Sequence, residues 1–485
     1  MSDIAFSSAT ELANKIKSKE ISAVELLQHY LQRVDKYNPE INAIVVDIRD
    51  EALAQARKMD AAIARGEDLG PFGGVPMTVK ESYNVVGTAT TWGNPEWRNN
   101  IATEDAESIK KLKGIGVNIF GKTNVPLSLA DFQSYNEVYG TTNNPYDLTR
   151  IPGGSSGGSA AALAAGLTGI ETGSDIGGSI RNPAHFCGVF GHKATYELLW
   201  MRGHAPPGDN RASSDISVIG PLARSARDLE TALLAMAGPN EIVARGMQLN
   251  LPKWQGRSLK GLRVAVWKND ENAPVSREVE ARVALVAQAL ADEGAIIDEA
   301  ARPSFSGDMS HDTYQNLLHA TMAMRMPDED YEGLKKYVEN LSPNDQSAGA
   351  KVLRAQVSSF KQWGAANEQR HKLRWQWHEF FKSYDVLLTP AMATPAFKHD
   401  HSKFGDRKIL VDNQERPYFE QVFWAGLSGV AYLPSTVIPT GLNDDGLPIG
   451  IQIVGPEYDD LITIGVAQEL EALGFRFTPP PAYSA

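Results

Sequence analysis

Over most of its length, the chain alternates short apolar runs with helix-like segments, and this alternation restricts the fold more than any other feature. Residues 76–80, 117–120 and 262–266 are apolar runs bounded by glycine, proline or polar residues, a pattern typical of buried strands. Residues 279–290 carry valine and leucine at helical spacing and are followed by Gly294, as expected for a helix that packs on a sheet. The sequence therefore predicts an α/β fold.

The flanking segments extend this prediction. The chain begins with helix-like sequence in which Ser22 opens a capping box. Residues from about 303 to 383 are polar, helical in pattern and rich in tryptophan, whereas strand character returns at residues 386–388 and 449–454. We expect distant parts of the chain to complete the sheet, with the helical segment laid over it. Because the sequence contains no internal repeat or low-complexity linker, we predict one domain over residues 1–485.

Charge and cysteine content exclude several function classes. The formal net charge of −12 argues against a nucleic-acid partner, because binding of phosphates needs a basic face. The single cysteine, Cys187, cannot form an internal disulfide. No apolar run approaches the roughly 20 residues that span a bilayer, and the first residues lack the pattern of a secretory signal. We expect a cytoplasmic protein without a nucleic-acid or membrane partner.

Two short motifs match well-known patterns without their structural context. Residues 116–123 fit the P-loop pattern G-x-x-x-x-G-K-[ST], but their four central residues are apolar and are interpreted as a strand. Residues 153–157 fit the nucleophile elbow G-x-S-x-G, but a loop rather than a strand precedes them, and the histidines are scattered. No histidine or cysteine spacing suggests zinc. We therefore expect neither a metal nor a cofactor.

Two glycine-serine segments, residues 153–158 and 175–181, are the strongest candidates for a functional site. Glycines let the backbone turn sharply and approach a ligand, and both segments lie amid apolar sequence rather than in a flexible linker. A serine nucleophile needs a base, and a buried lysine can supply one because burial favours its neutral form. Lys80, at the end of an apolar strand, is the candidate; a solvated strand end is the ordinary alternative.

These segments, together with others in the same order, resemble the amidase signature family of serine hydrolases. The resemblance covers most of the chain outside roughly residues 300–380 and implies a large, mixed, twisted central sheet flanked by helices on both faces. The matching segments are residues 74–80, 121–124, 144–147, 152–159, 173–181 and 446–452.

The resemblance implies a Ser-Ser-Lys triad. Ser179 would be the nucleophile that forms an acyl-enzyme, Lys80 the neutral general base, and Ser155 the bridging serine that relays a proton between them. This arrangement is a variant of the serine triad in which an amine replaces imidazole. We interpret the neighbouring Ser156 as a loop serine that bonds backbone, and Ser159 as a helix cap.

The loop around the nucleophile would carry the other parts of the site. The resemblance implies an oxyanion hole formed by the backbone amides of Ile176, Gly177 and Gly178, together with that of Ser179. The neighbouring Asp175 and Arg181 are expected to form a structural ion pair that braces this loop.

The resemblance implies hydrolysis or transfer of an amide C–N bond, on small-molecule substrates, with esterase or carbamate hydrolase activity also known in the family. One alternative is the glutaminase subunit of a tRNA-dependent amidotransferase, which needs partner proteins; another is a non-catalytic assembly subunit. Beyond Gly191 the sequence departs from the amidotransferase pattern, because residues 192–201 replace the usual Lys-Pro-Thr-Tyr-Gly-Arg run. We therefore favour a free-standing amidase, and a homodimer stays open.

The substrate pocket is expected to draw on the loop from Leu129 to Tyr135 and on the helical segment after Pro303. Aromatic residues there suggest a hydrophobic or aryl amide. The residues expected to line the pocket are Leu129, Phe132, Gln133 and Tyr135, with Trp92, Trp200 and Met201 as further wall residues.

Overall fold

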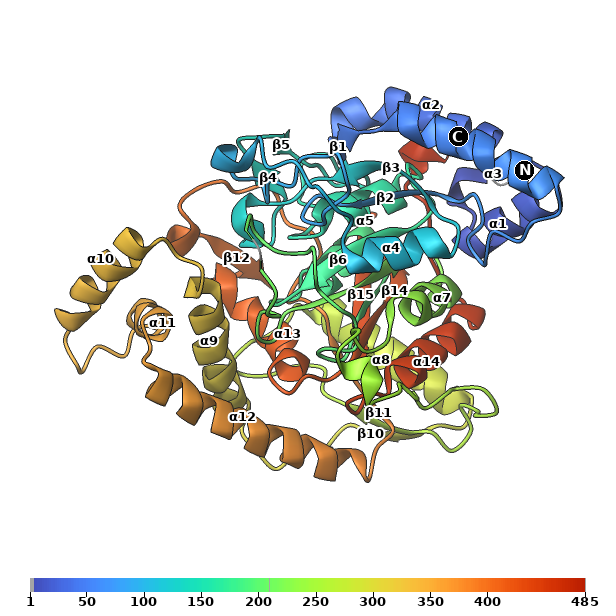
Figure 1. Ribbon diagram of the computed structural model, residues 1–485. Helices are drawn as coiled ribbons and strands as arrows, with labels where there is room; N and C mark the ends of the chain where they lie inside the picture. Colours follow the sequence, from blue (N-terminus) through green and yellow to red (C-terminus); the bar gives the residue numbers. More distant parts are fainter. Residues whose placement is uncertain (1–3, 209, 485) are drawn as a thin grey trace.

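The main sheet has eight strands in the order β10-β9-β11-β15-β14-β7-β8-β6 (Figure 1). The computed structural model describes residues 4–208 and 210–484. Strand β9 runs parallel to β10 and β11, and the other neighbours are antiparallel, so the sheet is mixed as expected. Its strands are β6 (Glu171–Asp175), β7 (Phe190–Lys193), β8 (Val218–Ala223), β9 (Arg263–Val266), β10 (Ile296–Asp298), β11 (Val386–Pro390), β14 (Ser435–Leu442) and β15 (Pro448–Val454).

Segments far apart in sequence meet in this sheet. Strands β9, β11 and β15, which contain three of the predicted strands, lie side by side although they span almost two hundred residues of chain. Along β15, Ile451 and Ile453 belong to the core formed with α8 (Arg277–Asp292) and α14 (Asp460–Ala472). The alternate residues Gly450 and Gln452 face α6 (Arg181–Cys187) on the other side. Helices therefore cover both faces of the sheet, as predicted.

A second, three-stranded sheet carries the lysine strand. It consists of β1 (Ile44–Asp47), β3 (Asn118–Thr123) and β2 (Pro76–Lys80), in the order β1-β3-β2. A single parallel bridge from Met77 to Ile170 places β2 next to the chain that enters β6. The P-loop-like motif is confirmed as strand, because its central residues form the buried β3.

The N-terminal helices are α1 (Ala9–Lys17), α2 (Ala23–Ile41) and α3 (Arg49–Ala64), which lie at one end of the molecule (Figure 1). The predicted capping box is present: the Ser22 hydroxyl accepts from the Glu25 amide, and the Glu25 carboxylate accepts from the Ser22 amide. These paired bonds fix the start of α2, whose apolar face is buried in the main core.

The predicted helical segment forms four helices that lie along one side of the molecule (Figure 1). They are α9 (Gly307–Ala323), α10 (Asp328–Glu339), α11 (Ala348–Gln356) and α12 (Phe360–Phe381). A second apolar core joins α9 and α12 to α13 (Val422–Gly429). On α12, Trp377 belongs to this core, whereas Trp375 points away from it and is exposed. This alternation is that of an amphipathic helix packed on one face.

The remaining α-helices and strands are short, and several single-turn 3-10 helices connect the elements. These short α-helices and strands are α4 (Glu107–Gly114), α5 (Gly157–Ala164), α7 (Ala226–Met236), β4 (Tyr135–Asn136), β5 (Gly140–Thr141), β12 (Lys408–Val411) and β13 (Gln414–Pro417). Within the described residues, none of the helices combines the length and apolar character that crossing a bilayer requires.

Candidate active site

Lys80 is the last residue of β2, and its side chain is fully buried. Its Nζ lies 2.7 Å from the Ser155 Oγ and 2.9 Å from the Oγ atoms of both Ser156 and Ser174. Ser174 belongs to β6, which is brought beside β2 where the two sheets adjoin. The lysine amine is therefore surrounded by three hydroxyl groups from two segments of the chain.

Burial lowers the pKa of Lys80 well below its usual value, and the negative charge of Asp175 opposes this shift only in part. A neutral amine has two N–H donors and one lone pair, so one of the three hydroxyls must donate to it. Ser156 Oγ already donates to the Ser174 carbonyl at 3.4 Å. The donor to the amine is therefore Ser155 or Ser174, and Ser155 makes the shorter contact.

The loop that holds Ser155 packs closely on its neighbours. A Cβ atom at Gly154 would lie 2.5 Å from the Asp131 carbonyl, so no larger residue fits there. The Gly154 amide donates to the Asn182 side chain at 2.9 Å, which also donates to the Gly178 carbonyl at 2.9 Å. Asn182 thus ties together the two glycine-serine segments.

The roles expected for the neighbouring serines need correction. Ser159 is not a helix cap: it lies inside α5, where its hydroxyl bonds Thr123 Oγ1 and the Thr172 carbonyl. Ser156 occupies the cap position without a side-chain capping bond. Its hydroxyl does bond backbone, as expected, but it also contacts Lys80.

Ser179 lies in the tight turn between β6 and α6 and is 6% exposed. Gly178 in this turn has φ +99°, a conformation that favours glycine. The Gly178 amide donates to Asp175 at 2.9 Å, so it is already occupied, contrary to its expected place in an oxyanion hole. Within the described residues, the amides of Ile176, Gly177 and Ser179 have no hydrogen-bond partner, and these three residues line a cavity. They are the donors available to an oxyanion.

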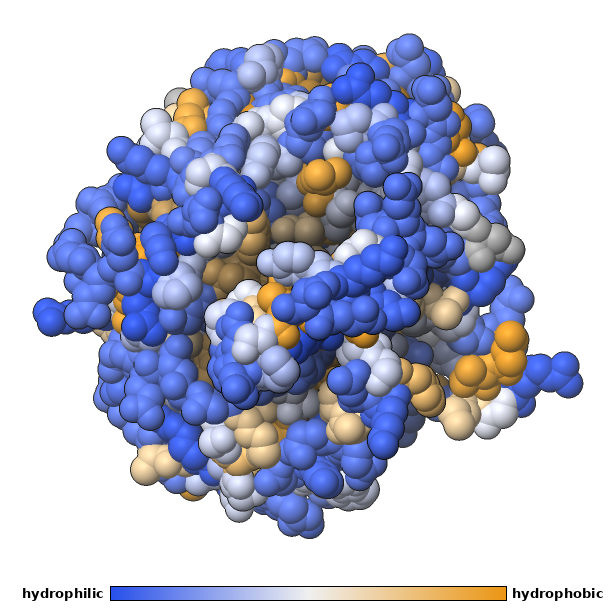
Figure 2. All heavy atoms as spheres, turned by 90° about the vertical axis from the view of Figure 1, so that its left-hand side faces the viewer, coloured by the Kyte–Doolittle hydropathy of each residue, from blue (hydrophilic) through white to orange (hydrophobic). Residues whose placement is uncertain are grey.

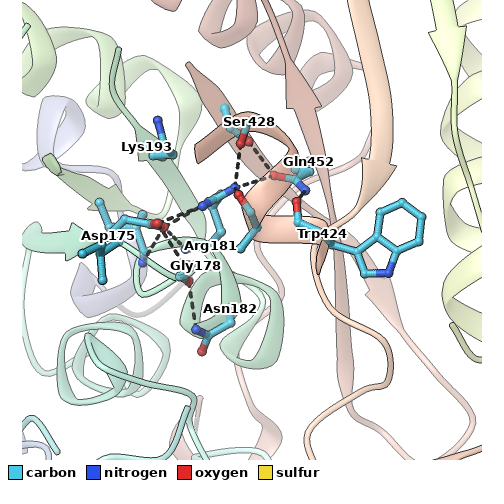
Figure 3. Close-up of polar contacts among 12 residues, drawn as sticks. Asp175, Gly178, Arg181, Asn182, Lys193, Trp424, Ser428 and Gln452 are labelled. Carbon is cyan, nitrogen blue, oxygen red and sulfur yellow. Dashed lines mark hydrogen bonds and ion pairs between the residues drawn. The ribbon is translucent and has the colours of Figure 1, made fainter. Parts of the chain in front are cut away.

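The predicted ion pair is present and buried. Arg181 bonds Asp175 at 2.8 and 3.0 Å, and it also reaches Ser428 on α13 and Gln452 on β15 (Figure 3). Burial by itself would raise the pKa of Asp175, but the charge and hydrogen bonds of Arg181 hold that pKa at about 2. The Asp175 carboxylate is therefore charged, and it fixes the turn that precedes Ser179.

In the part of the chain that the structure describes, no hydrogen bond joins the hydroxyls of Ser179 and Ser155. The backbone connects their segments instead, since the Ser156 amide donates to the Ser179 carbonyl at 3.2 Å. Ser179 opens onto a cavity of about 270 Å³ whose walls are mainly apolar. The side that carries α9–α12 is hollowed, with apolar atoms visible in the hollow (Figure 2).

The cavity contains only some of the expected pocket residues. Leu129 and Phe132 line it, together with residues of α9, α11 and the loop after Lys403. Gln133 and Tyr135 do not line it. Gln133 bonds the backbone of Asp400, and the Tyr135 hydroxyl accepts from Arg407 at 2.8 Å.

The aromatic wall expected from Trp92, Trp200 and Met201 is also absent from this cavity. Trp200 and Met201 line a separate small pocket, and Trp92 packs against His204 instead. Gln133, Tyr135 and Trp92 contact residues far along the chain, so local sequence gave no indication of their positions.

The sequence analysis did not single out three residues that contribute to the site or its cavity. Ser174 lies within a recognised motif, but only its contact with Lys80 shows a role. Asp131 binds Arg407 and Tyr418 at 2.6 Å each, beside the cavity. His319 on α9 lines the cavity, in the part of the chain that the family motifs do not cover. Among the described residues, no group of three or more His, Cys, Asp or Glu side chains could hold a metal ion.

Comparison with known proteins identifies the class to which this fold and serine-lysine cluster correspond. The family model described as Amidase matches residues 25–463, and the chain belongs to this family, the amidase signature enzymes.

Particular relatives differ in activity. The A subunit of the glutamyl-tRNA(Gln) amidotransferase of Koribacter versatilis is 32% identical over 485 residues, 96% of this chain and 97% of that protein. Fatty-acid amide hydrolase 2-A of Danio rerio is 32% identical over 496 residues, 96% of this chain and 88% of that protein.

Solved structures agree in fold. A bacterial aryl acylamidase of the amidase signature family superimposes with a TM-score of 0.81 at 23% identity, covering 99% of this chain and 98% of that one. The A subunit of the Thermotoga maritima glutamyl-tRNA(Gln) amidotransferase gives a TM-score of 0.77 at 25% identity, covering 99% of both chains.

Proposed function

We propose that this protein hydrolyses the C–N bond of a hydrophobic or aryl amide, releasing a carboxylic acid and ammonia or an amine, through an acyl-enzyme on Ser179. The observation that carries the proposal is the buried Lys80 amine 2.7 Å from the Ser155 hydroxyl, close to a serine turn with unpaired amides. A dry amine of lowered pKa is a competent base, whereas a solvated lysine is protonated at neutral pH.

In the proposed mechanism, Ser179 Oγ attacks the substrate carbonyl carbon and its proton passes to Ser155, which gives its own proton to the Lys80 Nζ. The negative charge on the carbonyl oxygen is stabilised by the amides of Ile176, Gly177 and Ser179. The proton returns through Ser155 to the leaving nitrogen as the C–N bond breaks. Water then attacks the ester, giving its proton to Lys80 through the same relay; the bond from the acyl carbon to Ser179 Oγ breaks, the carboxylic acid leaves, and the proton returns to Ser179. The missing Ser155–Ser179 bond would form as substrate binds, since catalytic hydrogen bonds often tighten at that stage.

The cavity supports a hydrophobic substrate. Its volume and mainly apolar lining suit a single ring or a short chain. Its one carboxylate, Asp131, already accepts from Arg407 and Tyr418, and no cationic side chain is among its described lining residues. The charged groups of glutamine would have no free partner there, which disfavours glutamine as the substrate.

The second candidate is a glutaminase subunit of an amidotransferase. The comparisons support it, whereas the apolar cavity does not. Several relatives of 30–32% identity that align over nearly the whole chain are A subunits of glutamyl-tRNA(Gln) amidotransferases. Such a protein would work with partner proteins, whereas the proposed amidase works alone on a small molecule. A non-catalytic assembly subunit is a third candidate, but it would not require the buried serine-lysine cluster.

Labelling and turnover by the purified single chain test the proposal. A fluorophosphonate should label Ser179, as located by peptide mass spectrometry, and a label on Ser156 would overturn the assignment of roles. A panel of aliphatic amides, p-nitroanilides, p-nitrophenyl esters and aryl carbamates should show turnover of apolar acyl groups. Ammonia release from glutamine that exceeds turnover of every member of the panel would favour the amidotransferase alternative.

A further inference from the structure

The apolar cavity contains few polar side chains that remain free. Ser179 belongs to the proposed reaction, and both carboxylate oxygens of Asp131 are occupied by Arg407 and Tyr418. His319 and Gln356 are the other polar residues among its described lining. His319 is only 8% exposed, so any polar contact it makes in the cavity is shielded from bulk water.

A chain of hydrogen bonds along α9 orients His319. Its Nε2 lies 2.9 Å from the Gln315 Oε1, and the Gln315 Nε2 lies 3.2 Å from the His311 Nε2. The three residues are spaced four apart and therefore share one face of the helix. On the other side, the His319 ring packs against Phe419, with ring centroids 6.0 Å apart.

These hydrogen bonds determine which ring nitrogen of His319 carries the proton. Burial lowers the pKa of His319 to about 4, with a smaller contribution from His311, so the ring is neutral at pH 7 and has one N–H. A carbonyl oxygen such as Gln315 Oε1 can only accept a hydrogen bond. The proton therefore lies on Nε2, and Nδ1 holds a lone pair.

The Nδ1 atom of His319 is accessible and makes no hydrogen bond within the part of the chain that the structure describes. The one bond of this ring is made by Nε2. The His311 Nδ1 is fully enclosed and has no partner among the described residues, whereas the His319 Nδ1 is not fully enclosed. Because His319 lines the cavity, this accessible Nδ1 is an unused acceptor at a mainly apolar wall, in which Gln356 is the other polar residue.

We propose that His319 determines substrate specificity, its Nδ1 accepting a hydrogen bond from an O–H or N–H group on the otherwise apolar acyl part of the amide. The inference rests on the proposed function and specifies its substrate class. A neutral hydrogen bond in a dry site discriminates against a substrate that lacks the donor, because the buried acceptor is then left unpaired.

Three p-nitroanilides with acyl groups of similar size test the inference: 3-(4-hydroxyphenyl)propanoyl, 3-(4-methylphenyl)propanoyl and 3-(4-methoxyphenyl)propanoyl. The hydroxyl compound should have a kcat/KM about tenfold above the methyl compound. The methoxy compound, which can only accept, should gain nothing. His319→Phe should bring the hydroxyl-to-methyl ratio to about one.

Two further variants separate a specific contact from a general disturbance. His319→Asn places an amide oxygen near the former Nδ1 and should restore part of the preference for the hydroxyl compound. Leu318→Met, on the same helix and in the same cavity, should leave the ratio unchanged. A preference for the methoxy compound, or a hydroxyl preference that survives His319→Phe, would overturn the inference.

Binding to a variant without the nucleophile tests His319 independently of turnover. By calorimetry, Ser179→Ala should bind the hydroxyl compound about tenfold more tightly than the methyl compound, and Ser179→Ala/His319→Phe should bind both equally. Absence of turnover in the native enzyme would count against the proposed function. Equal binding of both compounds to Ser179→Ala would count against the role of His319.

Discussion

The two walls of the cavity are built in different ways. The wall that contains Ser179 is fixed by charged and backbone hydrogen bonds, in which Asp175 holds the turn and Arg181 ties it to α13 and β15 (Figure 3). The opposite wall, formed by α9 and α11, presents mainly apolar side chains. A reaction needs atoms held at defined positions, whereas apolar recognition tolerates change. We therefore expect substitutions in the two walls to alter different kinetic constants.

The largest effect is expected from Ser179→Ala, which removes the proposed nucleophile. The kcat for any amide substrate should fall by roughly 10⁴-fold or more, because members of a triad act as a unit. Ser159→Ala is the matched control: this buried serine lies nearby but makes no contact with Lys80, and we expect it to retain most activity. Steady-state kinetics and fluorophosphonate labelling measure both variants.

Lys80→Met should reduce kcat almost as much. The pH dependence of its unfolding free energy also tests whether the Lys80 amine is neutral in the folded state. The unfolded lysine binds a proton below about pH 10.4, whereas burial keeps the folded lysine neutral down to its lowered pKa. Unfolding then takes up a proton in that window, so this group makes the free energy of unfolding rise with pH and fall as pH decreases.

Denaturant titrations at several pH values give the unfolding free energy as a function of pH. This free energy should rise less steeply with pH for Lys80→Met than for the native chain. The native kcat/KM should fall as pH decreases through the folded pKa, because protonation removes the base. Lys122→Met is the control for catalysis. Lys122 is also buried, with a pKa of about 8, but it does not contact the serines, so its loss should leave kcat largely unchanged. Equal slopes for the native chain and Lys80→Met would show that Lys80 is charged in the folded state.

Asp175→Asn should have the next largest effect, because it leaves Arg181 buried without its counter-charge. We expect a loss of about 3–5 kcal/mol in unfolding free energy and roughly a 10²-fold lower kcat as the turn loses its anchor. Asp385→Asn breaks the more exposed pair with Arg263 and should cost about 1 kcal/mol or less, with kcat unchanged. Thermal unfolding and kinetics distinguish the two; similar losses would mean that burial of the pair is unimportant.

The smallest effect is expected in the apolar wall. Met322→Ala removes a half-exposed side chain that lines the cavity, so KM for an apolar amide should rise roughly tenfold while kcat stays within about twofold. Met324→Ala, an exposed residue at the end of the same helix, should change neither constant. A drop in kcat for Met322→Ala with KM unchanged would contradict the proposed division between the walls.

Local patterns were enough to predict much of the fold. Strand β2, the capping box at Ser22 and the helix α8 depend on the residue types within one element, and the structure has all three. The Asp175–Arg181 pair was also predictable, because the two residues are six positions apart on one turn. The proposed roles of Lys80, Ser155 and Ser179 came from family motifs, and they stay predictions until the serines are labelled.

The sequence by itself determined the succession of strands and helices, because hydrophobic periodicity and capping act within a few residues of one another. Only the tertiary structure decided which groups meet in the site, because those contacts join residues far apart in the chain. Gln133 was expected in the pocket but bonds Asp400, 267 positions away, and Tyr418 reaches Asp131 across 287 positions. That His319 lines the cavity likewise follows from how distant segments pack together. In contrast, the Gly178 amide is taken by Asp175 three positions before it, so the free amides of the Ser179 turn are decided within the turn.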